Sequence, residues 1–329
     1  MHYLGIDVAK AKLDCCLLLD VTTCKRKTKS IPNNNTGFAE LIIWLGKQHL
    51  SLPEVHIIME STGVYHEQAA IALHEAGVRV SITNPAQVRD FAKGLAIRSK
   101  TDGIDSLVLA RYGALLQPTG WTPPTPQAIT LQALLARADA IQQDLLRERN
   151  RQEKADATDT PHLIRQSLAD SITFLQTQLK KLQQDIDDHI DRHPELRDDV
   201  TLLTTIPGIG LKTSQHLLSV MHLHSFHSAE RLAAYLGLVP IERQSGSSLY
   251  GRARLSKAGP ARVRAVLYMA AVVATRHNPY VKALYERLVT GGKSKMSALG
   301  TAMRKLVHLC FGVIKNRQPY CPDYCQGDC

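Results

Sequence analysis

The sequence predicts an α/β domain at its N-terminal end, followed by a chain that is mostly helical. Over the first 126 residues, short apolar runs alternate with helical patterns, which is the order expected of a mixed sheet flanked by helices. After a stretch with four prolines at 118–126, apolar residues recur with helical spacing. We therefore predict the class α/β plus α.

The expected elements of the first domain form a β-meander followed by an αβαβα order. Strands are expected at 3–7, 13–19, 29–32, 55–59 and 78–82, and helices at 36–49, 64–76 and 102–116. Thr36 is the expected N-cap of the first helix, and Gly77 ends the second. Asn84-Pro85 is interpreted as the end of the last strand. The run at 55–59 is typical of a buried strand and is followed by Glu60.

A long helical spacer is expected next. One helix is predicted at 127–149 and a loop tip at 154–161. A second helix carries apolar residues spaced alternately four and three apart, at Leu168, Ile172, Leu175, Leu179, Leu182 and Ile186. This spacing indicates a coiled-coil seam, which we expect to fray near His189 and His193. Packing within one chain and contact between two copies both remain open. The predicted domains are 1–126, the spacer 127–199, a basic helical domain 200–318 and a tail 319–329.

The net charge of +10 is unevenly distributed along the chain. From residue 201 onward there are 17 basic and 5 acidic residues, whereas residues 1–200 hold 23 basic and 25 acidic residues. Charge that served only solubility would not be confined to one half of the chain. The basic half therefore indicates a polyanionic partner, and nucleic acid is favoured.

The apolar runs and the cysteines bear on where the protein is located and on whether it has disulfides or a zinc site. The sequence offers no run long enough to span a membrane and no secretory signal, so we expect a cytoplasmic protein. The seven cysteines do not suggest a disulfide framework. Cys321, Cys325 and Cys329 recur every fourth residue, but Pro322 and Gly327 oppose a helix there. A zinc site in the tail is therefore not favoured.

Acidic residues stand at two predicted strand ends and at one helix start. Asp7 ends the first strand, Glu60 follows the fourth, and Asp102 and Asp105 lie three apart on one helix face. If the first and fourth strands are neighbours, these carboxylates converge and require cations such as Mg²⁺ or Mn²⁺. Two such ions can orient a phosphodiester. The alternatives are an N-cap role for Asp102 and simple solvation of strand-end acids, the class in which we place Asp14.

Two glycine-containing segments of the basic half are candidate nucleic-acid contacts. Ile206-Pro207-Gly208-Ile209-Gly210 precedes a helix predicted at 213–221, and this is the layout of a helix–hairpin–helix turn. Further on, Ser245, Gly246, Ser247 and Ser248 form a polar loop between two apolar helical segments. The predicted nucleic-acid-binding residues of both segments are Gly208, Gly210, Lys212, Arg243, Arg252, Arg254, Lys257 and Arg262.

Spacing alone does not make the serine loop catalytic. A serine hydroxyl attacks phosphorus only if its proton is removed and the phosphate charge is offset. The nearby arginines meet only the second requirement. On residue types alone, a phosphate-binding connector is therefore the favoured interpretation, and a nucleophilic Ser245 is the alternative.

The motifs in this order resemble those of the DEDD insertion-sequence transposases. This family is related to Piv-type DNA invertases and is described as bridge-RNA-guided serine recombinases. Gly5-Ile6-Asp7, Glu60-Ser61-Thr62-Gly63 and Lys100-Thr101-Asp102-Gly103-Ile104-Asp105 resemble its acidic motifs. Ile206-Pro207-Gly208-Ile209-Gly210, Ser245-Gly246-Ser247-Ser248 and Ser256-Lys257-Ala258-Gly259 resemble its C-terminal domain. The cysteine-containing tail has no counterpart in this resemblance.

The resemblance implies a fold, a mechanism and partners. It implies an N-terminal domain of the RuvC, ribonuclease-H-like fold in which Asp7, Glu60, Asp102 and Asp105 are catalytic and hold divalent metal. It also implies that Ser245 is the nucleophile, which reverses the interpretation from spacing. The implied partners are donor DNA, target DNA and a structured noncoding RNA. The implied assembly is a dimer that pairs into a tetramer, with the acids of one subunit meeting the serine of another.

Three functions compete at this point. A recombinase uses both Ser245 and the acids. A metal-dependent, junction-resolving nuclease needs only the acids and has no use for the serine loop. A non-catalytic nucleic-acid-binding protein needs neither, and the presence of all four acids weakens that alternative.

Overall fold

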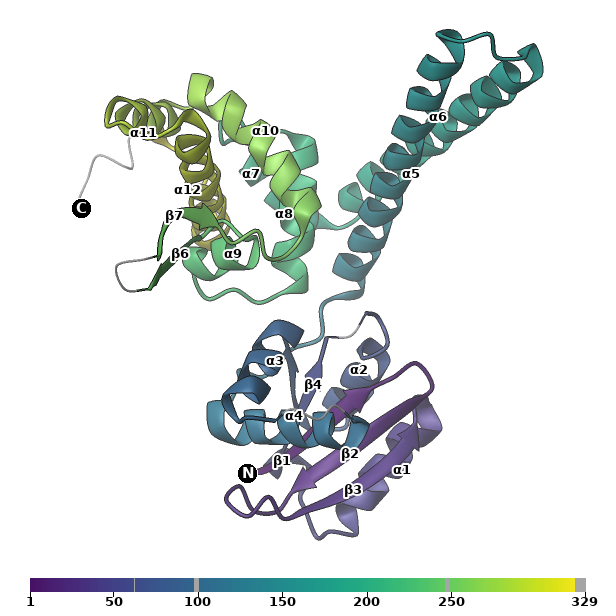
Figure 1. The fold of residues 1–329 in the computed structure, drawn as a ribbon, viewed down its shortest axis with the longest axis vertical. Coiled ribbons are helices and arrows are strands. Elements are labelled where there is room, and N and C mark those ends of the chain that lie inside the picture. The colour runs from purple at the N-terminus through teal and green to yellow at the C-terminus, as the bar shows by residue number, and fades with distance from the viewer. Residues whose placement is uncertain (62, 98–100, 246–248, 323–329) are drawn as a thin grey trace. The chain divides into compact units, whose positions relative to one another are not determined.

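The computed structural model describes residues 1–61, 63–97, 101–245 and 249–322, with the backbone alone at 243–245 and 249–253 (Figure 1). Thr62, Lys100 and the loop residues Gly246, Ser247 and Ser248 lie outside the described residues. The chain divides into two compact units, Met1–Pro123 and Pro124–Cys329. In the described part of the chain, no helix is both long and apolar enough to cross a membrane.

The first unit contains a five-stranded mixed sheet. Its order is β3-β2-β1-β4-β5, formed by strands β1 (His2–Val8), β2 (Lys12–Leu18), β3 (Arg26–Pro32), β4 (Val55–Glu60) and β5 (Arg79–Thr83). Strands β1, β2 and β3 pair antiparallel, whereas β4 pairs parallel with both β1 and β5. The predicted mixed sheet is confirmed. The first and fourth strands are neighbours, which is the condition on which convergence of Asp7 and Glu60 depended.

Helices cover both faces of this sheet. They are α1 (Asn35–Gly46), α2 (Glu67–Glu75), α3 (Pro85–Gly94) and α4 (Asp102–Leu116), with a short 3-10 turn η1 at Leu52–Glu54. Side chains of α1 and α2 share one apolar cluster with strand residues such as Leu4 and Ile57. Side chains of α3 and α4 pack with Ile58 on the opposite face. The sheet is therefore buried on both sides, as its nearly continuous apolar strands require.

Two helix starts differ from those expected. The N-cap of α1 is Asn34, whose side chain accepts a hydrogen bond from the Gly37 amide, so the expectation of Thr36 was wrong. Asn84-Pro85 does end β5, but it also begins α3, which was not expected. The Asn84 side chain accepts from the Ala86 amide, and proline suits the first helical position because it lacks the N–H that would be unsatisfied there.

The second unit begins with an antiparallel helical hairpin, α5 (Pro126–Asp156) and α6 (His162–Asp191) (Figure 1). Leu179, Leu182 and Ile186 of the predicted seam pack against Leu131 and Leu135 of α5 within the same chain. The expected fraying does not occur, because α6 continues to Asp191 and His189 Nε2 donates to the Gln127 carbonyl at 3.0 Å. At least half of the seam is thus an intrachain contact.

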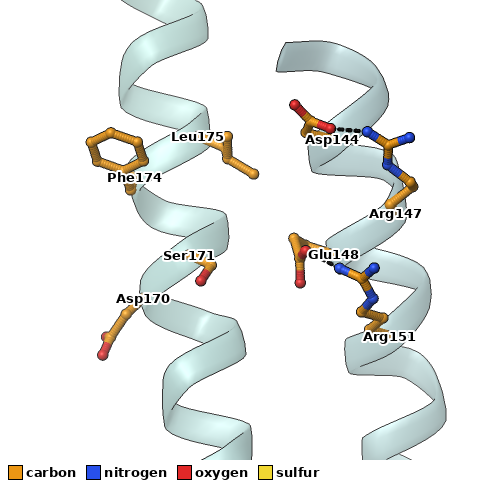
Figure 2. Close-up of a pocket in the computed structure, with 8 residues that line it drawn as sticks. All are labelled: Asp144, Arg147, Glu148, Arg151, Asp170, Ser171, Phe174 and Leu175. Carbon is orange, nitrogen blue, oxygen red and sulfur yellow. Dashed lines mark hydrogen bonds and ion pairs between the residues drawn. The ribbon is translucent and has the colours of Figure 1, made fainter. Parts of the chain in front are cut away.

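Farther along this hairpin, α5 and α6 enclose a groove of about 730 Å³ (Figure 2). On its α5 side, Arg147 pairs with Asp144, and Arg151 pairs with Glu148. Its α6 side carries Phe174, whose side chain is 63% exposed. The groove contains none of the residues that the sequence suggests for catalysis.

The rest of the second unit is a helical bundle with one β-hairpin. Its helices are α7 (Pro194–Thr204), α8 (Leu211–Leu223), α9 (Ala229–Tyr235), α10 (Ala261–His277), α11 (Pro279–Thr290) and α12 (Lys295–Asn316). They share an apolar core that includes Leu203, Leu217, Leu267 and Leu306. Strands β6 (Pro240–Ser245) and β7 (Leu249–Leu255) pair antiparallel where the sequence suggested only a loop.

Candidate active site

Asp7 and Glu60 lie at neighbouring strand ends. The register of β1 and β4 pairs Ile6 with Met59, so the next residue of each strand is one of the two acids. Parallel strands end at the same sheet edge, which explains why two acids 53 residues apart come together. Asp7 is partly buried.

Helix α4 brings the other two acids toward the same edge. Asp102 is its first residue and Thr101 its N-cap, so Asp102 is not the cap of this helix. Close approach of α4 to the sheet depends on Gly5, where an added Cβ would lie 1.9 Å from the Ser106 carbonyl oxygen. Asp105 is one residue from that contact and lies on the same side of the helix as Asp102.

The pKa of Asp7 reports the convergence of these acids. Burial is the largest cause that raises this pKa, and the surrounding carboxylates raise it further, to about 6. In decreasing order of effect, these carboxylates are Asp105, Asp102, Asp14 and Glu60. All four acids that the sequence suggested are therefore near one another, and Asp14 joins them.

Sequence reasoning missed two participants, Asp14 and Lys12. Asp14 pairs with Asp7 across β1 and β2, so it is part of the acidic cluster and not merely a solvated acid. Lys12 Nζ donates to Asp102 Oδ2 at 2.7 Å and forms an ion pair with Asp14 Oδ2 at 2.9 Å. This hydrogen bond is the main cause that lowers the pKa of Asp102. The sequence did contain an indication of this pair, because Lys12 and Asp14 are two residues apart at the start of a predicted strand region and residues at that spacing share one face of a strand.

The cluster has the chemistry of a divalent-metal site but not its closed geometry. Its donors are carboxylate oxygens, which hard cations prefer, and their mutual repulsion at Asp7 is what a cation relieves. The Lys12 ammonium already lies between two of the acids as a bound positive charge. Among the residues described, no three side chains are gathered as ligands of one ion. Metal binding would therefore require these side chains to move closer together.

The glycine turn before α8 is a close-packed junction. Gly208 has φ +102°, and a Cβ there would lie 2.7 Å from the Ala274 Cβ of α10, so packing alone requires a glycine. Gly210 is the N-cap of α8, with open space where a Cβ would be. The free amides at the start of α8 remain suited to a phosphate.

Two of the predicted nucleic-acid contacts also link helices of the second unit. Lys212 Nζ donates to Gln142 Oε1 at 2.8 Å. Arg262 donates from Nε to Asp139 Oδ1 at 2.7 Å and from NH2 to Gln142 Oε1 at 2.9 Å. These bonds connect α8 and α10 to α5. A phosphate contact from either cation would compete with these bonds.

Ser245 is the last residue of β6, at the start of the hairpin turn. Arg243 and Arg252 lie on β6 and β7, and Arg254 pairs with Ile241 lower on the hairpin. At the base, the Lys257 amide donates to the Gly237 carbonyl, and Arg264 NH1 donates to the Ala258 and Gly259 carbonyls. The serine thus sits on a two-stranded projection whose base is hydrogen-bonded to the bundle.

These features together define a class of protein, an enzyme that processes nucleic acid by phosphoryl transfer. Comparison with known proteins identifies the family. A transposase family model for the DEDD domain of IS110 elements matches residues 4–155, and the model described as "Transposase IS116/IS110/IS902 family" matches residues 200–286. The chain belongs to the IS110 family of transposases, and it is an enzyme that cuts and rejoins DNA.

Individual relatives agree with this placement. The chain is 35% identical to the pilin gene-inverting protein of Moraxella lacunata over 320 residues, which is 97% of each chain. The protein of the same name from Moraxella bovis matches equally well. The chain is 28% identical over 160 residues to the "Insertion element IS110 uncharacterized 43.6 kDa protein" of Streptomyces coelicolor, covering 48% of this chain and 38% of the relative. Membership of the DEDD group implies use of a divalent metal ion.

Proposed function

We propose that this chain is a DNA recombinase that moves or inverts a DNA segment through a covalent link to Ser245, assisted by a divalent-metal site. The proposed metal site is supported by the gathering of carboxylates around Asp7. The serine half is supported by the position of Ser245 at the start of the β6–β7 turn, on a hairpin that carries several arginines. The full-length match to a gene-inverting protein supports inversion or transposition as the outcome.

The proposed step exchanges one phosphorus–oxygen bond for another. Ser245 Oγ bonds to the phosphorus as the bond to one deoxyribose oxygen breaks, and the serine proton ends on that oxygen. Rejoining reverses the step with the hydroxyl of a new strand, so no water is consumed. Arg243, Arg252 and Arg254 would offset the charge that develops on the phosphate oxygens. Lys257 and the start of α8 would bind the sugar–phosphate backbone of the DNA on either side of the attacked phosphate.

Asp7, Glu60, Asp102 and Asp105 are the residues proposed to hold Mg²⁺ or Mn²⁺. When bound, the ion supplies positive charge opposite the phosphodiester oxygens and orients them. The role of Lys12 is to neutralise Asp14 and Asp102 until the ion is present, since its ammonium contacts both. The partly buried Asp7 carboxyl, crowded by like charges, gains most from the ion.

Exchange of Ser245 for alanine tests the covalent mechanism. We expect Ser245→Ala to bind DNA within about twofold of the wild type while recombination falls by at least about 10³-fold, since the nucleophile is lost. The measurement is recombination of a two-site plasmid together with recovery of covalent protein–DNA adduct. Asp102→Asn should also abolish recombination, whereas the neighbouring Ser247→Ala is the matched control and should remain active.

Continued DNA cutting by Ser245→Ala would identify the alternative function, a nuclease. If Ser245→Ala still cuts DNA and leaves ends made by hydrolysis, the protein is a metal-dependent nuclease and the serine mechanism is wrong. If Ser245→Ala and Asp102→Asn both recombine DNA as the wild type does, neither the serine nor the acidic cluster is catalytic and the proposed mechanism is wrong.

A guide RNA is the proposed source of target choice. We expect a structured noncoding RNA, encoded beside this gene, to copurify with the protein and to pair with donor and target DNA. Sequencing the copurified RNA checks this directly. A random collection of cellular RNA fragments would contradict guidance and would leave the serine mechanism untouched.

Assembly into a dimer and then a tetramer is proposed through the α5–α6 hairpin. Its exposed apolar side chains support this, because Leu163 is 78% exposed and Phe174 is 63% exposed. Burying these side chains against another copy of the chain would remove their apolar surface from water. The mass of the purified protein by light scattering distinguishes monomer, dimer and tetramer.

A further inference from the structure

A cleft of about 460 Å³ lies in the second unit and contains none of the residues used above. It is lined by the end of α8, the segment after it, and the end of α12. The residues that matter here are His222, Phe226, His227, Phe311, Lys315 and Arg317. Aromatic and cationic side chains are therefore combined in one concave site, a combination that recognises nucleic-acid strands.

The floor of the cleft holds Arg317 in place. Asp199 of α7 is 2% exposed and accepts hydrogen bonds on both carboxylate oxygens, from His222 Nε2 at 2.8 Å and from Arg317 NH1. A carboxylate can only accept, so His222 carries its proton on Nε2. Arg317 ends α12 in the left-handed conformation and remains 56% exposed. Its guanidinium is thus anchored at one nitrogen while the rest of the side chain faces solvent.

The rim of the cleft adds positive charge that no described carboxylate neutralises. Lys315 is exposed and, within the described ranges, has no carboxylate at ion-pair distance. His227 is also exposed on this rim. In the part of the chain that the structure describes, Asp199 is the carboxylate that lines the cleft, beside the two permanent cations Lys315 and Arg317, so the lining carries excess positive charge that favours an anion. Burial lowers the pKa of His222, and the Glu195 carboxylate, which lies outside this lining, opposes that effect.

The aromatic walls limit which anion fits. Phe226 is partly buried and is held by edge contacts to Tyr235 and His224, with ring centroids 5.4 and 6.1 Å away. Phe311 is partly buried on the α12 side. An inorganic phosphate or an acidic side chain would use the cations but would leave these rings uncovered. A cleft of this size holds a phosphate together with one base.

We propose that this cleft binds a single unpaired nucleotide of a nucleic-acid strand, with its phosphate on Lys315 and Arg317 and its base against Phe226 and Phe311. A paired base cannot enter, because both of its faces are stacked in the duplex. The proposal rests on the proposed function only in assuming a nucleic-acid partner. It does not depend on Ser245 or on any cutting step.

Photocrosslinking to the full chain tests the proposal. The probes are single-stranded ten-nucleotide RNA with 4-thiouridine and the matching DNA with 4-thiothymidine, followed by mass spectrometry of the crosslinked peptides. We expect crosslinks at Phe226 or Phe311. Lys315→Gln should lower their yield about fivefold or more, whereas Lys293→Gln, which removes one exposed lysine outside the cleft, should change it less than twofold.

A second variant separates stacking from charge. Phe311→Leu keeps an apolar side chain but removes the ring, and it should weaken binding of the same probes about fivefold, as loss of one base stack does. The RNA and DNA arms show which strand uses the cleft, since a nucleotide of that strand gives the larger yield.

Two results would overturn the proposal. One is crosslinking confined to peptides outside residues 221–227 and 308–317. The other is an equal loss with Lys315→Gln and Lys293→Gln, which would reduce the cleft to part of a general basic surface. Failure of the serine mechanism gives a different pattern, because Ser245→Ala would then still recombine DNA while the crosslinks at the cleft persist.

Discussion

Asp7 and Asp199 are both withdrawn from solvent, but their surroundings are opposite. Asp199 is almost fully buried and bonded to one histidine and one arginine, so its charge is matched. Asp7 is less buried than Asp199, and its partial burial together with four surrounding carboxylates raises its pKa to about 6. Lys12 is bonded to two of these acids. A matched buried charge holds helices together, whereas an unmatched cluster is destabilising by itself and is retained for its chemistry.

The largest expected effect comes from the glycine that lets the acids meet. Gly5→Ala places a Cβ against the Ser106 carbonyl, so α4 must move away from the sheet and stability falls by about 2–3 kcal/mol. Thermal unfolding followed by circular dichroism measures this. Gly46→Ala at the end of α1 is the control, since its Cβ meets nothing within 4 Å, and it should be neutral. Equal effects of the two changes would show that close approach at Gly5 is not required.

Removal of the Asp199 charge should lower the stability of the protein somewhat less than Gly5→Ala does. Asp199→Asn leaves Arg317 without its carboxylate, and the second unit should lose about 2 kcal/mol of stability in urea unfolding. Adding Arg317→Met removes the unpaired cation, and the double variant should recover part of the loss. If Asp199→Asn stabilises the protein, the contrast with Asp7 disappears.

The smallest expected change in stability comes from Asp7→Asn, which should stabilise the protein instead of destabilising it. Because the folded-state pKa of Asp7 is raised from 3.8 to about 6, the folded protein binds a proton more tightly there than the unfolded chain does. This contribution is fully present below pH 4 and is lost as the pH rises through about 6. In EDTA at pH 8, Asp7→Asn should therefore stabilise the protein by about 1 kcal/mol, allowing for solvent screening.

Urea midpoints at two pH values and with added metal check this prediction. At pH 3.5 the gain from Asp7→Asn should be nearly absent, because most of the Asp7 carboxyl is then protonated in the folded state. At pH 8, Mg²⁺ or Mn²⁺ should stabilise the wild type and leave Asp7→Asn unchanged. A variant that is less stable than the wild type at pH 8 in EDTA would contradict the interpretation of Asp7 as an unmatched charge.

The local sequence pattern was sufficient to predict several structural elements of the protein. Apolar runs followed by Asp7 and Glu60 located the ends of β1 and β4 to within about one residue, and the helix over 102–116 was predicted with the bounds found in α4. The order of strands and helices was enough for the mixed sheet. These features depend on residues close together in the chain, so alternation and helical spacing report them directly.

The rest depended on contacts between distant segments. Asp14 joined the acids only through its cross-strand register with Asp7, and α4 reached the sheet only through Gly5. Asp199 and Arg317 are 118 residues apart, and nothing near either residue in the sequence marks them as partners. The sequence by itself determined which residues could do chemistry, because side-chain type is local. The tertiary structure decided which of them meet and which charges are balanced, because register and packing join positions that are far apart along the chain.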